Sequence, residues 1–330
     1  MNPLIDRYIQ YVESVRRYSP RTRDIYRDTL EEFAVYSFEN PEDAGALPGA
    51  LTSTAIRNYE VYLMEDRKVD ARTVNLHLSV LSGFCRYLMT QGLLKSNPVR
   101  LVTRPKTDKR LPVFYRDESM ERYFADTEYA ISEDSLELLR SLRPEDRKLA
   151  EELYGRCLRR MVVSFLHATG IRRAELASLD VRNVDNSRNV LMVRGKGDKM
   201  REVPLVPAIV RELGLYLQAA EAFFGGAPAA GDPLLRTPSG RRLYPVFIDR
   251  AVKEELGSVP DITGRKSPHV LRHTLATELL NDGSDLNSIK ELLGHSSLAA
   301  TQVYTHNSIE KLKAVYGKAH PRAKDPESRD

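Results

Sequence analysis

Apolar side chains recur at intervals of three or four residues along most of this chain, which is the spacing of one face of an α-helix. Four such stripes lie in the first hundred residues, over 4–15, 26–33, 56–63 and 74–88. Ser19 followed by Pro20 is a typical helix start, and Gly92 is a typical stop. The pattern predicts a small four-helix domain over residues 1–95.

Residues 190–206 depart from the helical pattern. Two short runs rich in β-branched and apolar residues, 190–193 and 203–206, flank the polar turn GKGDK, which is the signal of a β-hairpin. Further helices are expected at about 207–222, 268–282, 285–293 and 308–317. The fold class predicted is therefore mainly α with a small antiparallel β-sheet, in two domains, the second over 113–330.

A basic connector is expected between the two domains, over residues 96–112. This segment contains three prolines, and 100–110 holds five basic side chains against one acid, Asp108. Prolines with solvated charge are typical of linkers. The segment is either only a soluble connector or lies along a polyanion such as a phosphate backbone.

An acidic segment follows the connector. Residues 117–152 contain twelve acidic and five basic side chains, a net charge of −7, whereas the whole chain has a net charge of +4. The remainder therefore carries +11. We expect surface helices here with a turn near Pro144, their acids in solvent.

Several function classes are disfavoured. No apolar run reaches the 18 or so residues of a membrane span, and the first thirty residues do not resemble a signal peptide, so a cytoplasmic protein is expected. Cys85 and Cys157 are too few for a disulfide framework or a four-cysteine zinc site and are expected in the core. No Walker A, HExxH, CxxC or GxSxG motif occurs. No cofactor, metal or small-molecule substrate is expected.

Cations and imidazoles gather at helix boundaries in the second half. In SPHVLRHTLAT, Ser267 and Pro268 begin a helix that places His269 and Arg272 on one face. A helix start already favours anions, so this pair could bind a phosphate. Taken alone, it could equally be a solvated polar stripe.

The order of five motifs distinguishes these possibilities. ATGIRRAEL, GKGDK, HVLRH, LLGHSS and TQVYTH follow one another, with Tyr304 nine residues after His295. This arrangement resembles the tyrosine recombinase (phage-integrase-type) family, and most closely the bacterial Xer recombinases. The resemblance implies a two-domain, C-shaped clamp in which a helical, SAM-like core-binding domain precedes an α+β catalytic domain. The acidic segment is longer than the family's usual spacing.

The resemblance assigns a role to six residues. Arg172 and Arg272 match the arginines that bind the scissile phosphate, and Tyr304 matches the nucleophile that forms a 3′-phosphotyrosyl link. His269 matches the residue that assists its deprotonation. The remaining matches are His295, on the phosphate, and Lys196, the general acid. Lys199 in the same turn remains an alternative to Lys196.

The implied partner is double-stranded DNA carrying a specific site. Candidate DNA contacts are Arg21, Arg23, Arg104, Lys106, Lys109 and Arg110. By resemblance, helix 308–317 would dock into a neighbouring protomer of a homo- or heterotetramer, although its apolar stripe alone would also allow it to dock on its own domain. The resemblance does not inform the acidic segment. Its net charge predicts instead that it lies away from the duplex or contacts a protein. An Xer role would be resolution of chromosome dimers before chromosome partition and cell division, at the nucleoid, with a second recombinase and a DNA translocase as possible partners.

Three other functions remain open at this stage. The first is an integrase or excisionase of a mobile element, which would serve DNA integration. The second is a type IB topoisomerase, and the third is a non-catalytic DNA-binding descendant of such enzymes. The two-domain layout with the HVLRH and LLGHSS motifs favours a recombinase over a topoisomerase. The six matched active-site positions disfavour a non-catalytic protein.

Overall fold

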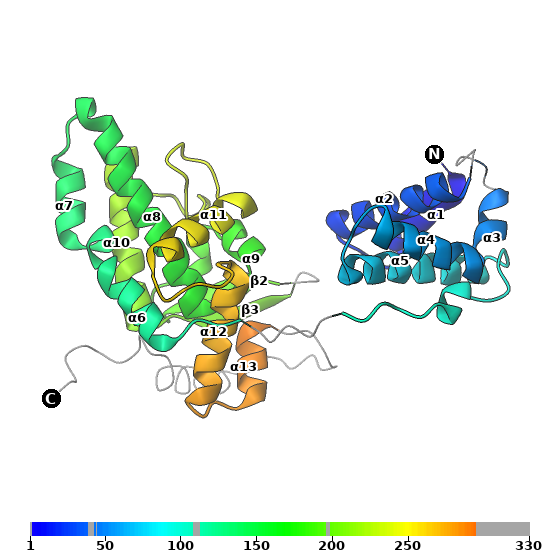
Figure 1. Cartoon of the computed structure of the whole chain (residues 1–330). Helices are drawn as coiled ribbons and strands as arrows, with labels where there is room; N and C mark the ends of the chain where they lie inside the picture. The colour runs from blue at the N-terminus through cyan, green and yellow to red at the C-terminus, as the bar shows by residue number, and fades with distance from the viewer. Residues whose placement is uncertain (1, 39–42, 44, 108–112, 196–198, 295–330) are drawn as a thin grey trace. The chain divides into compact units, whose positions relative to one another are not determined.

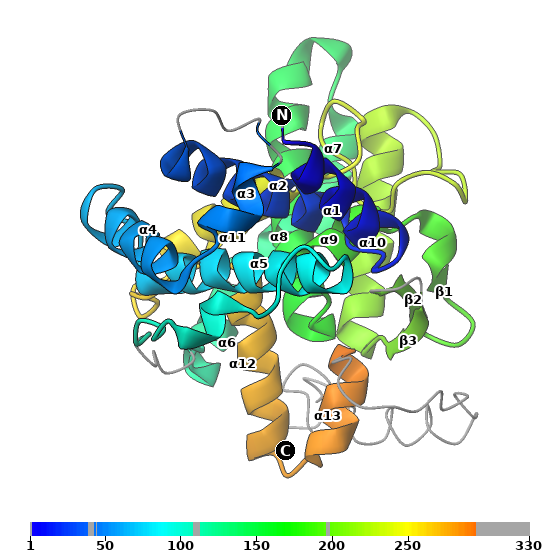
Figure 2. The same ribbon diagram turned by 90° about the vertical axis from the view of Figure 1, so that its right-hand side faces the viewer.

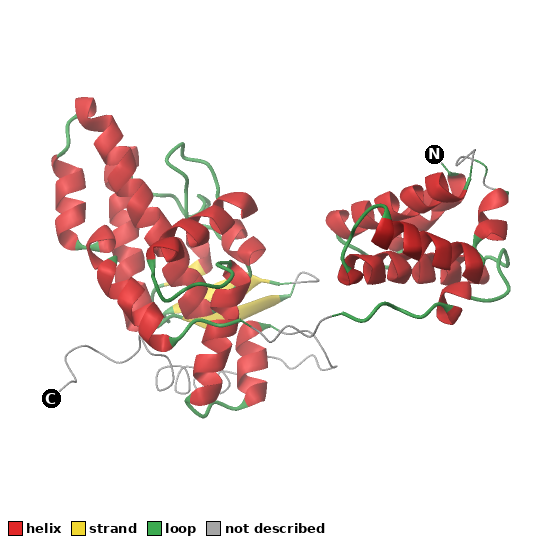
Figure 3. Cartoon of the chain, in the orientation of Figure 1, coloured by secondary structure: helices red, strands yellow, loops and turns green. Residues whose placement is uncertain are grey.

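The computed structural model describes residues 2–38, 43, 45–107, 113–195 and 199–294. The chain divides into two compact units, Met1–Arg110 and Leu111–Asp330. Most described residues are helical, and a single small antiparallel sheet lies among the helices of the second unit (Figure 3). The predicted fold class, mainly α with a small antiparallel sheet, is confirmed. No helix within the described ranges is long and apolar enough to span a bilayer.

The first unit is a bundle whose helices bury the predicted apolar stripes. Its elements are α1 (Pro3–Ser14), α2 (Pro20–Ser37), α3 (Ala46–Ala50), α4 (Ser53–Glu65) and α5 (Ala71–Thr90). The Ser19 side chain caps α2 by accepting from the Thr22 N–H at 3.2 Å. One cluster of buried side chains joins the four long helices and includes Cys85. The short helix α3, which adds Leu47 to this core, was not predicted because it contains no full apolar repeat.

The start of the connecting segment is packed onto the first unit. Residues Pro98–Leu101 form a 3₁₀ turn, and Val99 and Val102 belong to the same core as α1 to α5. The Asn97 side chain donates to the Ser82 carbonyl at 3.2 Å. Residues 97–102 therefore differ from the solvated connector that composition suggested, because two valines find apolar partners. The boundaries at 95 and 112 stay predictions.

Helix α8 (Arg147–Thr169) is the centre of the second unit. Its last ten residues, 160–169, are all buried, as expected of a helix surrounded by other elements. The elements packed on it include α7 (Glu133–Ser141), α10 (Pro207–Phe224), α11 (Pro245–Glu255) and α12 (Pro268–Asn281). Cys157 lies in this core as a free thiol. The core fixes the end of α8, where the candidate site begins.

The acidic segment forms surface helices whose inner faces belong to this core. It comprises α6 (Asp117–Asp126), α7 and the 3₁₀ turns Glu128–Ile131 and Pro144–Asp146. Its acids are exposed, apart from half-buried Glu151. The buried Tyr123 hydroxyl donates to Glu255 on α11 at 2.9 Å. The expected turn at Pro144 is confirmed, and the solvated acids are carried by helices that also stabilise the unit.

The sheet contains the predicted hairpin and one further short strand. Strands β1 (Val184–Asp185), β2 (Val190–Arg194) and β3 (Met200–Pro204) pair antiparallel in that order, with Leu191 opposite Val203. Leu191, Val193 and Val203 face the core. Arg201 faces inward with them and is only 6% exposed. The hairpin thus presents one charged side chain to the interior.

Candidate active site

Arg172 lies in the turn that follows α8. Gly170 ends α8 in the left-handed conformation, with φ of +59°, and Arg172 is the N-cap of α9 (Arg173–Ser178). Its N–H and Nη1 both donate to the Glu175 carboxylate at 2.8 Å, and Nη2 donates to the Gly294 carbonyl at 2.9 Å. These contacts hold the guanidinium in one place while its side chain remains 36% exposed.

We expect Gly170→Ala to lower the free energy of unfolding by about 3 kcal/mol, because a left-handed alanine is strained and the site is full. A Cβ there would lie 2.5 Å from Leu293 Cδ2 and 2.9 Å from Leu275 Cδ2. Gly225→Ala is the matched control, because Gly225 ends α10 at φ +76° with open space around it. It should lose only about 1 kcal/mol. Equal losses by urea denaturation would contradict the steric argument.

Arg272 is a buried cation on α12. It is 7% exposed, and its Nη1 and Nη2 donate to the carbonyls of Gly170 and Leu293, both at 2.6 Å. Burial lowers the pKa of Arg272 to about 10, and the neighbouring Arg172 charge acts in the same direction. The guanidinium still carries its charge near neutral pH. Within the described part of the chain, the hydrogen bonds of this buried cation go to carbonyls and not to a carboxylate, so it is suited to an incoming anion.

The end of α13 (Leu286–Leu293) brings the two arginines together. Figures 1 and 2 both show α12 and α13 side by side, joined by a short turn. Gly294 ends α13 at φ +66°, and the carbonyls of Leu293 and Gly294 accept from Arg272 and Arg172 respectively. Two guanidiniums from distant parts of the chain therefore meet at consecutive peptide groups. The predicted His295 follows directly in sequence but lies outside the described residues.

His269 occupies the first turn of α12 and its side chain is exposed. Partial burial lowers the pKa of His269 below its usual value, and the positive charges of Arg173 and Arg272 add to this. The imidazole is therefore mostly neutral near pH 7. A neutral imidazole near the Arg173 and Arg272 guanidiniums can act as a proton acceptor.

The remaining predicted catalytic positions are only partly described. Lys199 precedes β3 and is exposed, whereas Lys196 lies outside the described residues. Tyr304 and the predicted helix 308–317 also lie outside them. The choice between Lys196 and Lys199 therefore stays a prediction in favour of Lys196.

Two residues that the sequence analysis did not single out belong to the same site. Glu175 is 6% exposed and its carboxylate receives four hydrogen bonds, two from Arg172 and two from Arg201, the latter at 3.0 and 2.8 Å. Burial would raise the pKa of Glu175, but the bonds from Arg201 and Arg172 outweigh it and the pKa lies below its usual value. Two sequence signals were present. Glu175 lies three residues after the N-cap Arg172, the position from which a glutamate binds the start of a helix. Arg201 lies two residues before Val203 in the strand, so both side chains are on the same, inward face.

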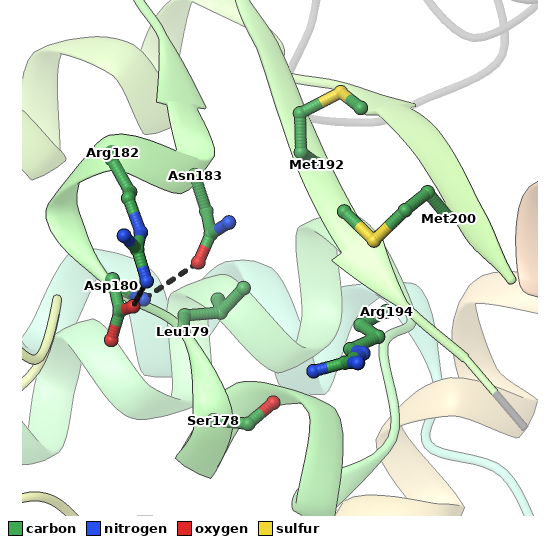
Figure 4. Close-up of a pocket in the computed structure, with 8 residues that line it drawn as sticks. All are labelled: Ser178, Leu179, Asp180, Arg182, Asn183, Met192, Arg194 and Met200. Atoms are coloured by element: carbon green, nitrogen blue, oxygen red, sulfur yellow. Dashed lines mark hydrogen bonds and ion pairs between the residues drawn. The ribbon is translucent and has the colours of Figure 1, made fainter. Parts of the chain in front are cut away.

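A pocket of about 350 Å³ lies beside the hairpin, and neither Arg172 nor Arg272 lines it. Asp180, Arg182 and Asn183 line one side of it, and Met192 and Met200 the other (Figure 4). Of the predicted catalytic residues that the structure describes, Arg172, His269 and Arg272, none lines it. Among the described residues, no group of three or more His, Cys, Asp or Glu side chains is arranged to hold a metal ion.

The predicted DNA contacts lie in the first unit or outside the described residues. Arg21 and Lys106 are exposed. Arg23 pairs with Glu13 at 2.8 Å, and Arg104 donates to the Ser79 hydroxyl at 2.9 Å. Lys109 and Arg110 are not described. Arg23 and Arg104 are thus engaged with their own unit, and all six remain predictions.

Comparisons with known proteins identify the family of this chain. Residues 147–311 match the phage integrase family, and residues 4–93 match the phage integrase N-terminal SAM-like domain. Tyrosine recombinase XerC from Chlorobaculum parvum is 32% identical over 97% of this chain and 94% of its own length. XerC from Mycobacterium sp. (strain KMS) is 35% identical over 98% and 100%.

A solved structure with the same fold is that of the Tn1549 transposon integrase in complex with transposon right end DNA. It has a TM-score of 0.63 and 16% identity, over 95% of this chain and 99% of that one. The arginines of the site lie within the segment that the phage integrase family matches. This chain belongs to the phage integrase family and is a tyrosine site-specific recombinase of the Xer type.

Proposed function

We propose that this recombinase binds double-stranded DNA at a specific site and exchanges strands through a 3′-phosphotyrosyl intermediate at Tyr304. The observation that carries the proposal is the meeting of Arg172 and Arg272 at the carbonyls of Leu293 and Gly294. Among the described residues, each guanidinium donates two of its five N–H groups to the protein at this site. The other donors suit the non-bridging oxygens of a phosphodiester.

The proposed cleavage step conserves the energy of the DNA backbone. The Tyr304 oxygen attacks the scissile phosphorus, the bond from phosphorus to the 5′ oxygen breaks, and a tyrosyl phosphodiester replaces an alkyl one. His269 accepts the phenol proton and Lys196 supplies a proton to the leaving 5′ oxygen. The reverse attack by a partner strand's 5′-hydroxyl rejoins DNA.

The arginine pair supplies the electrostatic part of this step. Charge builds up on the two non-bridging oxygens as the tyrosine attacks, and preorganised guanidiniums stabilise it without moving. His295, next to Gly294 in the sequence, would add a hydrogen bond to the same phosphate. The reaction is proposed to need no cofactor.

The proposed biological setting is that of an Xer recombinase acting in the cytoplasm on the chromosome, with resolution of chromosome dimers as its outcome. Curated relatives named XerC that align over nearly the whole chain support this setting. A tetramer on DNA, with helix 308–317 docked on a neighbour, belongs to the same proposal. The alternative is action on a mobile element.

The test is to trap the protein covalently on DNA. Fragmented genomic DNA of the source organism is incubated with the protein, the complexes are denatured in SDS, and the attached DNA is sequenced. We expect one short site with two inverted arms. Adducts spread over unrelated sequences, together with relaxation of any supercoiled plasmid, would favour a type IB topoisomerase. Absence of any adduct would contradict the proposed function.

We expect the rate of adduct formation to be constant near neutral pH and to fall as the pH drops through the pKa of His269, below 6.5. The fall should approach tenfold per pH unit, because protonated imidazole cannot accept the phenol proton. His269→Gln should lower the plateau by about 100-fold and abolish this acid limb. Single-turnover rates from about pH 5 to about pH 8 measure both effects.

His273→Gln is the matched control for this profile, because His273 lies one turn further along α12 and is exposed. It should leave the plateau unchanged and keep the acid limb, moved at most slightly toward higher pH because the His273 charge contributes to the lowered pKa of His269. An acid limb that persists in His269→Gln would show that another group accepts the proton.

A further inference from the structure

Three arginines from three different elements converge on the last turn of α13. Arg201 Nε lies 3.4 Å from the Leu292 carbonyl oxygen, Arg272 donates to Leu293 at 2.6 Å, and Arg172 donates to Gly294 at 2.9 Å. The last carbonyls of a helix have no partner within the helix. Here three consecutive carbonyls receive guanidinium donors instead. Two of these arginines are proposed to bind phosphate, which leaves the role of Arg201 to be explained.

Arg201 is bound most strongly to Glu175. Its Nη1 and Nη2 donate to the two carboxylate oxygens at 3.0 and 2.8 Å, and both side chains are nearly excluded from solvent. The same two oxygens accept from the N–H and Nη1 of Arg172. With four donors, the carboxylate has its full set of hydrogen bonds.

The two hydrogen bonds from Arg201 to Glu175 limit how Arg172 can bind the same carboxylate. If Arg201 were absent, Glu175 would be a buried carboxylate that is still bound by Arg172, and it could bind both terminal nitrogens of that guanidinium. Arg172 Nη2 would then leave the Gly294 carbonyl and turn away from a phosphate. Arg201 occupies the second half of the carboxylate and so limits Arg172 to one side-chain contact with it.

Arg201 also sets the position of Gly294. A Cβ at Gly294 would lie 3.1 to 3.2 Å from Nε, Cδ and Cζ of Arg201, so the arginine packs directly against this peptide. A lysine has no planar fork and cannot hold a carboxylate and a main-chain surface in one fixed geometry. One side chain of strand β3 thus touches the partner of the first catalytic arginine and the residue before His295.

We infer that Arg201 is a positioning residue which, through Glu175 and Gly294, holds Arg172 at the spacing from Arg272 that the scissile phosphate requires. The inference rests on the proposed function. Arg201 is buried and has no role as a DNA contact. It acts on the reaction only through the residues that it positions.

The test compares two scissile groups in nicked duplexes that carry the site recovered from trapped DNA. One duplex has the natural phosphate, and the other has a methylphosphonate, in which a neutral methyl group replaces one charged oxygen. We expect Arg201→Lys to slow adduct formation on the phosphate by about 100-fold, because a misplaced clamp stabilises the charged transition state poorly. The loss on the methylphosphonate should be less than about tenfold, since less charge develops there.

Arg188→Lys is the matched control, because Arg188 forms a two-bond pair with Glu202 in the same sheet, at 3.1 and 2.7 Å, outside the arginine cluster. It should leave both rates unchanged. Equal losses on the two substrates, or no loss on the phosphate, would overturn the inference. An inactive wild-type protein would instead overturn the proposed function.

A second variant separates positioning from folding. Arg201→Lys could unfold the chain by weakening a buried ion pair, so the double variant Arg201→Gln with Glu175→Gln removes both charges together and leaves no unpaired buried ion. We expect it to stay folded by circular dichroism and to show the same preferential loss on the phosphate. Folded protein with wild-type rates on both substrates would overturn the inference.

Discussion

Tyr304→Phe is expected to abolish the covalent adduct between the protein and a nicked DNA substrate. Removing the oxygen that attacks phosphorus leaves no nucleophile, and losses on the order of 10⁶-fold are typical of essential nucleophiles. The measurement is the fraction of labelled DNA that migrates with protein after denaturation in SDS. DNA binding by mobility shift should be retained, because the arginine pair and both units are unchanged.

Tyr244→Phe is the control for this prediction. Tyr244 is 49% exposed at the start of α11 and no catalytic role is proposed for it, so its adduct yield should equal that of the wild type. An undiminished adduct in Tyr304→Phe would contradict the assignment of the nucleophile, even if recombination were otherwise observed.

Arg272→Lys is expected to slow cleavage by about 1,000-fold, which is the upper range for loss of one preorganised donor group in a transition state. Lysine keeps the charge but cannot reach two carbonyls and a phosphate with one ammonium group. The carbonyls of Gly170 and Leu293 each lose a donor at 2.6 Å, so the free energy of unfolding should also fall by about 2 kcal/mol. Single-turnover cleavage and urea denaturation measure the two effects separately.

Arg250→Lys provides the comparison, because Arg250 is an exposed arginine of α11 that makes a long pair to Glu254 and lies 5.8 Å from the centre of the Phe247 ring. It should change neither quantity. If Arg272→Lys lost stability but cleaved at the wild-type rate, Arg272 would be a structural residue and not part of the clamp.

The four long helices of the first unit, the hairpin and the arginine pair could be predicted from the sequence, each for a physical reason, whereas α3, α11 and β1 were not predicted. Helix boundaries followed from local signals such as Ser19 before Pro20, because caps act within a few residues. The hairpin followed from a change in apolar period between residues 190 and 206. Arg172 and Arg272 followed from motif order. Their contacts with the carbonyls of Leu293 and Gly294 could not be predicted, because every amino acid supplies a main-chain carbonyl and the sequence does not show which one an arginine will bind.

The residues that were missed depend on tertiary packing. Glu175 and Arg201 are charged, and charge in a short helix or edge of a hairpin normally indicates solvent. The ion pair between these two residues, which are 26 positions apart, makes their burial tolerable, and Arg172 adds two further hydrogen bonds to Glu175. The burial of residues 97–102 likewise depends on tertiary packing. Val99 is a core residue because the helices of the first unit pack against it. Composition is a property of one segment, whereas burial depends on the residues of other segments that pack against it.

The three carbonyls at the end of α13 also determine what can vary in this region. Every amino acid supplies the same peptide oxygen. The contacts of the arginines therefore depend on the position of the main chain and not on the side chains of α13. Substitutions at the exposed positions of α13 are therefore compatible with the site, whereas an inserted or deleted residue in the helix would rotate the acceptors by about 100°. In this part of the molecule, length is under stronger constraint than identity.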